Sequence, residues 1–107
     1  MGEVFQIVFS PRSLRDLKSI VSFIRPRGGP EVAARCGNQL IDRAMTLTSL
    51  PERGRAVPEL GLPYREIIFK SYRIIYRIDG EKVFVLRYWH TARGIPEIDS
   101  DAFRDQN

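Results

Sequence analysis

The chain of 107 residues has the length of one domain, and its 43% hydrophobic and 28% charged residues are ordinary for a globular protein. This composition excludes a wholly disordered chain, and a single cysteine excludes an intramolecular disulfide. The net charge of +4 suits a polyanionic partner without requiring one. We expect one domain over residues 1–107.

The start of the chain follows a strand pattern and not a signal-peptide pattern, and the longest apolar run is far too short to span a membrane. A cytoplasmic protein is therefore expected. The glycines lack the spacing of a phosphate-binding loop, and neither a Ser-His-Asp order nor paired metal carboxylates occur. One histidine and one cysteine cannot build a four-ligand zinc site. No cofactor and no metal are expected.

The first half of the chain predicts a strand followed by two helices. Residues 4–9 are apolar apart from one glutamine, which favours a strand that is protected on both faces. A Ser-Pro pair at 10–11 is typical of a helix start, and apolar residues at helical spacing predict a helix that ends before Pro26. Residues 25–30 (RPRGGP) predict a tight turn, and a second helix should cover 30 to about 50.

The second half predicts a loop and three strands. Residues 51–63 are rich in proline and glycine and form the loop. β-Branched and aromatic residues then alternate with polar ones, and two turn signals divide the run. The predicted strands cover about 64–69, 72–78 and 82–90. Near the end of the chain, Asp99 or Ser100 could cap a short helical turn through Phe103.

This order predicts an α+β fold with an N-terminal strand, an antiparallel helical hairpin and a three-stranded antiparallel meander, in which the helices pack on one sheet face. The first strand should return beside the last or the middle strand of the meander. The other sheet face lacks a helical cover and should meet solvent, a partner or a substrate.

Positive charge should gather on the uncovered face. Arg73 and Arg77 lie on one side of the middle strand because side chains alternate, and Arg65 should join them from the preceding strand. The last strand adds one of two alternating sets. These sets are Val83, Val85, Arg87 and Trp89, or Phe84, Leu86, Tyr88 and His90. One interpretation is a surface for RNA or acidic peptides, because guanidinium groups bind phosphates and aromatic rings stack on bases. The other is a solvated face with cross-strand ion pairs, for example to Glu66 or Glu81.

The only histidine, His90, lies where the last predicted strand meets a loop. Imidazole titrates near neutral pH and a strand end is open to substrate, so His90 is a candidate general acid. A structural histidine that bonds to the backbone is the alternative.

Several segments form a pattern that is specific in combination and order. They are the first strand with its Ser-Pro helix start, residues 54–60 (GRAVPEL), 65–66 (RE), 72–77 (YRIIYR) and 90–93 (HTAR). With them the chain resembles, over nearly its whole length, the RelE/ParE superfamily of type II toxin-antitoxin toxins, and its ParE branch most closely. The resemblance implies a small toxin that a cognate antitoxin neutralises by wrapping over hydrophobic and basic surfaces in a hetero-oligomer.

The resemblance implies one of two targets. Proteins similar to ParE poison DNA gyrase and do no chemistry of their own. Proteins similar to RelE cut messenger RNA on the ribosome, and for such a ribonuclease Arg73 matches the phosphate-binding arginine, while Glu59 and His90 lie near the base and the acid of some members. The residues expected to meet the target are Arg65, Arg73, Arg77, Tyr88 and Arg93.

The chain departs from the RelE pattern in two places. It has Tyr64 and Glu66 where RelE-like members carry lysines, and no tyrosine follows His90. Glu66 in a phosphate-binding row would repel the substrate. We therefore expect inhibition of gyrase by binding, with an mRNA endoribonuclease and a non-toxic antitoxin-binding regulator as alternatives.

Overall fold

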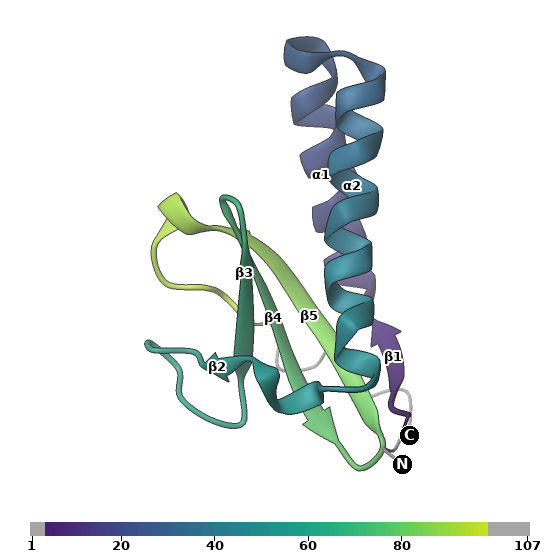
Figure 1. Ribbon diagram of the computed structural model, residues 1–107. Helices are drawn as coiled ribbons and strands as arrows, with labels where there is room; N and C mark the ends of the chain where they lie inside the picture. The colour runs from purple at the N-terminus through teal and green to yellow at the C-terminus, as the bar shows by residue number, and fades with distance from the viewer. Residues whose placement is uncertain (1–3, 99–107) are drawn as a thin grey trace.

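The computed structural model describes residues 4–98, in which two helices cover one face of a five-stranded sheet (Figure 1). The helices are α1 (Pro11–Gly28) and α2 (Pro30–Met45), followed by short 3-10 turns at Thr46–Thr48 and Pro51–Arg53. The strands are β1 (Gln6–Phe9), β2 (Arg55–Ala56), β3 (Arg65–Phe69), β4 (Tyr72–Asp79) and β5 (Lys82–His90), and a third 3-10 turn covers Thr91–Arg93. The predicted α+β architecture is confirmed, while the helical turn predicted through Phe103 lies outside the described residues.

Helix α1 begins as its sequence predicts and ends later than predicted. Ser10 Oγ accepts a hydrogen bond from the Ser13 N–H at 3.0 Å, which caps the helix start. The helix runs through Pro26 to Gly28, so the prediction that it ends before Pro26 was wrong. Pro26 removes the bond that its own N–H would make to the Ser22 carbonyl, and the helix continues for two more residues beyond it. Gly29, with φ of 91°, then turns the chain. The tip of this hairpin projects beyond the sheet (Figure 1).

Strand β1 pairs in parallel with β5, the last strand of the meander. This is one of the two positions that were predicted for it. The strand order is β1-β5-β4-β3-β2, so β1 is an edge strand. The expectation of a strand protected on both faces was therefore wrong, and Gln6 is exposed. Ile7 and Phe9 pack against the main core on one side of the strand, while the edge position leaves the strand only partly buried.

The main core lies between the hairpin and the sheet. Its side chains come from both helices and from β3, β4 and β5, and each fully buried aliphatic side chain contributes about 1.5–3 kcal/mol. The buried members are Leu17, Leu40, Ala44, Leu47, Ile67, Ile74, Tyr76, Val83, Val85 and Tyr88.

An irregularity in the pairing of β4 with β5 divides the side chains of β5 between the two faces. Ile75 pairs with Arg87 and Tyr76 pairs with Val85, so Leu86 is an extra residue in β5. Before this β-bulge the odd-numbered residues of β5 face the helices, and after it the even-numbered residues do. Each of the two alternating sets expected from the sequence consequently has members on both faces of the sheet. Phe84, Arg87 and Trp89 leave the strand on the face away from the helices, although the long Arg87 side chain extends to Asp16 of α1. Val83, Val85, Tyr88 and His90 lie on the helical side.

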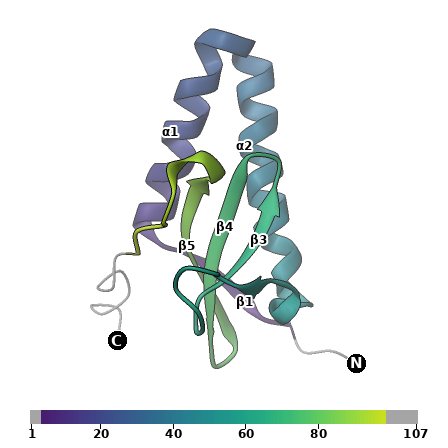
Figure 2. The same ribbon diagram turned by 90° about the vertical axis from the view of Figure 1, so that its left-hand side faces the viewer.

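The face away from the helices is partly covered by the chain itself. A second, smaller cluster buries Val57, Ile75 and Trp89, with Tyr64 and Ile98 packed against it. Figure 2 shows the segment after β5 and the loop around β2 crossing in front of the sheet. The face that was expected to be open is therefore covered at its centre.

A buried ion pair fastens α1 to the part of β5 that extends beyond β1. Asp16 accepts hydrogen bonds from Arg87 Nε at 2.8 Å and Nη2 at 3.1 Å, and also from the Tyr88 N–H at 3.0 Å. The carboxylate thus accepts the Tyr88 N–H hydrogen bond that a neighbouring strand would otherwise accept at this edge of the sheet. Sequence spacing gave no signal for a contact between positions 16 and 87.

We expect Asp16→Ala to lower the free energy of unfolding by about 3–5 kcal/mol, because it leaves the Arg87 guanidinium buried without its carboxylate. Denaturant midpoints would measure the change. Asp42→Ala, at an exposed position of α2, is the matched control and should change the midpoint little. Equal midpoints for the two variants would contradict this role for Asp16.

Candidate functional site

Four charged side chains form a continuous series of ion pairs on the face away from the helices. Arg55 Nε contacts Glu66 Oε2 at 2.8 Å, and Arg73 Nε contacts Glu66 Oε1 at 2.6 Å. Arg73 Nη2 and Nη1 donate to the two carboxylate oxygens of Glu59 at 2.6 and 3.1 Å. Arg73 Nη1 also reaches the Gly94 carbonyl at 3.4 Å. Two cations and two anions therefore compensate one another.

Burial makes this pairing obligatory. The Glu66 side chain has 0% exposure and that of Arg73 has 8%, so neither charge is left to solvent. The hydrogen bonds to Glu59 are the main cause that raises the pKa of Arg73. The same bonds from Arg73 lower the pKa of Glu59 below its ordinary value. Glu59 is consequently a weak base, and the cross-strand ion pair expected as one alternative for Glu66 is present.

Two of the predicted target-binding residues do not lie on the sheet face that was expected for them. Arg65 pairs with Tyr76 and so lies on the opposite face from Arg73, where its Nη1 donates to the Gly54 carbonyl at 2.9 Å. Tyr88 is buried in the main core, and its hydroxyl donates to the Leu40 carbonyl at 3.0 Å. Burial raises the pKa of Tyr88. Both placements correct the sequence-based expectation, because alternation predicts a face only when the register is known.

Arg77 lies on the face that was predicted for it, and Arg93 lies in the 3-10 turn after β5. Arg77 pairs with Phe84 across the strands and its guanidinium lies over the Phe84 ring, 4.8 Å from the centroid. Arg93 lies over the Trp89 ring at 3.8 Å. Each arginine is thus held against an aromatic ring, which fixes the position of its charge.

His90 lies apart from the Arg73 cluster. It pairs with Tyr72 on the helical side of the sheet, whereas Arg73 pairs with Trp89 on the other side. His90 Nδ1 accepts a hydrogen bond from the Ala92 N–H at 3.0 Å, so the side chain caps the 3-10 turn after β5. The structure therefore does not bring His90, Arg73 and Glu59 together around one point.

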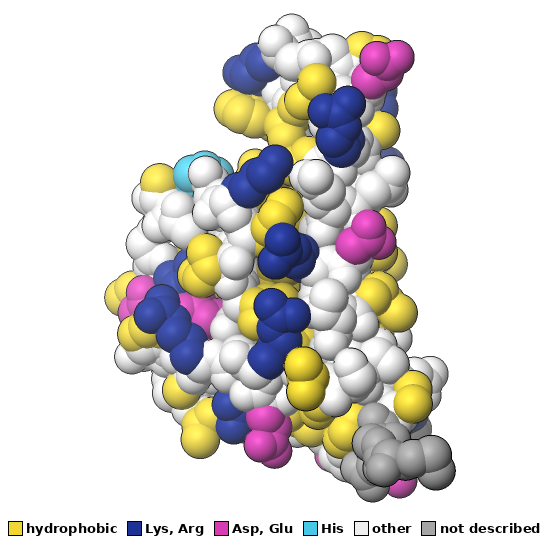
Figure 3. Space-filling model, in the orientation of Figure 1, with side chains coloured by type: hydrophobic (Ala, Val, Ile, Leu, Met, Phe, Trp, Pro, Cys, Tyr) yellow, Lys and Arg dark blue, Asp and Glu magenta, His cyan; other side chains and the backbone are white. Residues whose placement is uncertain are grey.

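Sequence reasoning missed a row of basic residues where α2 meets β3. Lys70 Nζ donates to Gln39 at 3.3 Å, Arg43 lies over the Phe69 ring at 4.5 Å, and Arg53 donates to Thr46 at 2.7 Å. Figure 3 shows Lys and Arg side chains gathered along this junction. The sequence shows these basic residues only in separate segments, and their grouping could not be predicted because they are far apart along the chain.

Two structural absences complete the description of the site. Within residues 4–98, no group of three or more His, Cys, Asp or Glu residues is arranged to hold a metal ion. In the same range, no helix is long and apolar enough to cross a membrane.

Comparison with known proteins identifies the family and with it the class of protein. The family described as "ParE toxin of type II toxin-antitoxin system, parDE" matches residues 7–95. The chain belongs to this family and is a toxin of the type II toxin-antitoxin class, within the ParE/RelE superfamily.

Relatives carry both names of the superfamily. "Toxin RelE1" of Caulobacter vibrioides is 34% identical over 90 residues, which cover 80% of this chain and 92% of that protein. The fold is similar to a chain of the chromosomal ParDE system from P. aeruginosa, with a TM-score of 0.73 and 17% identity over 81% of this chain and 96% of that chain. It is also similar to a chain of the RelBE2 toxin-antitoxin complex from Mycobacterium tuberculosis, with a TM-score of 0.60 and 25% identity over 82% of this chain and 92% of that chain.

We expect Glu66→Ala to lower the free energy of unfolding by about 3–5 kcal/mol, because it breaks a buried ion pair and leaves Arg73 with Glu59 alone. Urea denaturation would measure the loss. Glu52→Ala, at an exposed position in the 3-10 turn before β2, should be nearly neutral. A Glu66→Ala variant as stable as the Glu52→Ala control would contradict the role of this pair.

The lowered pKa of Glu59 predicts how stability depends on pH. The ionised carboxylate stabilises the folded state above its ordinary pKa of 4.5, and this contribution is lost as the pH falls through the lower pKa of the folded state. Wild type should therefore exceed Glu59→Gln in stability at pH 7, and the difference should shrink towards pH 3. A difference of constant size in denaturant midpoints over this pH range would show that the charge of Glu59 is not the cause.

Proposed function

We propose that this toxin inhibits DNA gyrase by binding and performs no chemistry of its own. The observation that carries the proposal is the separation of the residues that a ribonuclease would need. Arg73 and Glu59 lie on one side of the sheet and His90 on the other, and this separation supports binding over a mechanism in which an acid and a base flank one scissile phosphate.

The charges of the cluster support the same proposal. A phosphate would have to displace two carboxylates from Arg73, one of which, Glu66, is buried on the same strand face. Glu59 has a lowered pKa, and a general base works best when its pKa lies near the operating pH. The cluster is therefore suited to fixing the sheet surface and poorly suited to proton transfer.

We infer that the target meets Arg77 and Arg93. Both arginines lie over aromatic rings on the face away from the helices. Arginine and aromatic residues are enriched among the residues that contribute most to protein interfaces. Arg65 and Tyr88 do not belong to this surface because their contacts are internal.

We also infer that a cognate antitoxin covers the helical hairpin. The two similar solved structures come from toxin-antitoxin systems. Exposed apolar side chains on the hairpin offer a surface that a helix or extended segment of a partner would bury. These side chains are Leu14, Phe23, Val32, Ile41 and Met45. Co-expression with the adjacent gene should yield a stable complex.

A supercoiling assay with purified gyrase and relaxed plasmid tests the proposed target. We expect supercoiling to fall as the protein is added in excess, and Arg93→Ala to need about ten times more protein, as for the loss of one well-placed arginine contact. Arg25→Ala, an exposed arginine near the hairpin tip, is the matched control and should inhibit like wild type. Unchanged supercoiling at excess wild-type protein would refute gyrase as the target.

A messenger RNA endoribonuclease is the second candidate, because the Caulobacter vibrioides relative is named RelE1. His90→Asn separates the two candidates, since asparagine can still accept the Ala92 N–H but cannot act as an acid. The binding proposal predicts that His90→Asn keeps its inhibition of gyrase and that messenger RNA stays intact. Cleavage of messenger RNA by wild type and its loss in His90→Asn would support the ribonuclease.

A regulator without toxicity is the remaining alternative. It predicts that neither gyrase nor messenger RNA is affected while the antitoxin still binds tightly. Growth after induction of the protein alone, measured beside the two assays, distinguishes this outcome.

A further inference from the structure

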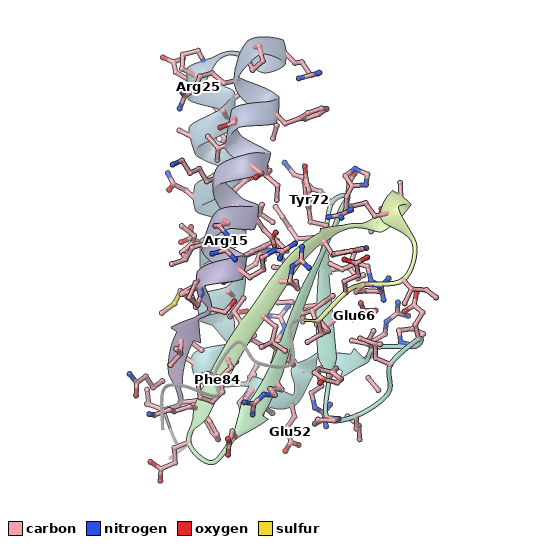
Figure 4. The ribbon with its side chains drawn as sticks, turned by 180° about the vertical axis from the view of Figure 1, so that it is seen from behind. Arg15, Arg25, Glu52, Glu66, Tyr72 and Phe84 are labelled. Carbon is pink, nitrogen blue, oxygen red and sulfur yellow. The ribbon has the colours of Figure 1, made fainter. Side chains whose placement is uncertain are left out.

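A cavity of about 550 Å³ lies between α1 and the upper ends of β4 and β5. Arg12, Arg15 and Phe23 come from α1, Tyr72 and His90 come from the strand ends, and Arg93 comes from the 3-10 turn that follows. Figure 4 shows Arg15 on α1 and Tyr72 at the end of the sheet nearest to it, with Glu66 elsewhere on the sheet. This volume falls in the range of pockets that hold small ligands.

The cavity carries uncompensated positive charge. Asp16 is its one lining carboxylate, and Arg87 already binds both oxygens of that carboxylate. Arg12 reaches Asp16 only at 4.0 Å. Among residues 4–98, neither Arg15 nor Arg93 has a carboxylate partner. Arg87 in the cavity wall, and Arg55 and Arg73 elsewhere in this structure, are each paired with an acid, so the unpaired arginines at the cavity mark it for an anion.

Aromatic groups and neutral donors surround this charge. Phe23 is 58% exposed, and the Arg27 guanidinium lies over its ring, 3.7 Å from the centroid, so a ligand would stack on the other face of the ring. The Tyr72 hydroxyl has no hydrogen-bond partner among the described residues, and the Tyr72 ring packs edge-on against His90 at 5.3 Å. His90 Nδ1 accepts the Ala92 N–H, so the proton of the neutral imidazole lies on Nε2, which is free to donate. The cavity therefore combines cationic donors with surfaces that suit a planar ring.

We propose that this cavity binds a nucleoside phosphate. The phosphate pairs with Arg15 and Arg93, because guanidinium groups bind phosphate oxygens bidentately, and the base stacks on Phe23 or Tyr72. A phosphate dianion fits the several positive groups better than a single carboxylate does. The site shares Arg93 with the surface inferred to meet the target, but Arg15, Phe23 and Tyr72 are not part of that surface, so the proposal can be tested whether or not gyrase is the target.

Isothermal titration calorimetry with adenosine 5′-monophosphate tests the site directly. We expect the nucleotide to bind more tightly than adenosine or inorganic phosphate, since each of these lacks one half of the recognition. Arg15→Ala should weaken nucleotide binding about tenfold, the usual effect of losing a hydrogen bond to a charged group. Phe23→Ala should weaken it by a similar factor through lost stacking. Both side chains are exposed on α1, so folding should be unaffected.

Arg25→Ala is the matched control, because Arg25 lies on α1 but lines a separate groove between the two helices. A short single-stranded RNA with a 5′-phosphate identifies the source of the ligand. Binding of RNA much more tightly than of the mononucleotide, with the same losses in Arg15→Ala and Phe23→Ala, supports the site and assigns it to a strand end. Comparable binding supports a free nucleotide.

Three results would overturn the proposal. The first is no heat of binding for either phosphorylated ligand at millimolar concentration. The second is equal weakening by Arg15→Ala and Arg25→Ala, which would mean only a general attraction of anions to a basic chain. The third is binding of an acidic peptide without binding of the nucleotide, which would make this cleft a protein-docking surface.

Discussion

The extra residue at Leu86 is the constraint on which the arrangement of the functional side chains depends. Without it, Tyr88 and His90 would lie on the same face as Phe84, and Arg87 and Trp89 would face the helices. With it, Trp89 reaches the second core and Tyr88 reaches the main one. The same shift separates His90 from Arg73, so one inserted residue decides whether the chain has an acid beside its central arginine.

Charge compensation is the second organising feature. Arg73 and Arg87 are the buried arginines of the described chain, and each is held by carboxylates from distant positions, Glu59 and Glu66 for the first and Asp16 for the second. Buried charges need partners because their removal from water is costly. Arg15, Arg77 and Arg93 lie nearer the surface, where Arg77 pairs with Asp79 at 3.3 Å. The proposals for target and ligand binding place their contacts at these arginines.

The ParE and RelE names among the relatives share one fold, and a fold of this kind does not determine the target. Function has to be argued from side chains that differ between proteins of the same architecture. Here the pairing of Arg73 with two carboxylates and the position of His90 on the other side of the sheet support the proposal of binding over cleavage. A cavity between α1 and the ends of β4 and β5 adds a second surface, whose chemistry differs from that of the Arg73 cluster.

The sequence by itself determined the order and class of the elements. Local signals did this: the Ser-Pro start of α1, the glycines and prolines of the turns, and the alternation in β3, β4 and β5 depend on neighbouring residues only. The segments that carry the family resemblance also indicated the family, which the comparisons confirmed.

Only the tertiary structure decided which side chains meet. Arg65 turned away from Arg73, Tyr88 entered the core, and Asp16 paired with Arg87, because each depends on strand register or on contacts between distant segments. A shift of one residue reverses every later side chain of a strand, and nothing in the local sequence around Leu86 specifies that shift. The position of a residue along the chain therefore predicted its element well and its face poorly.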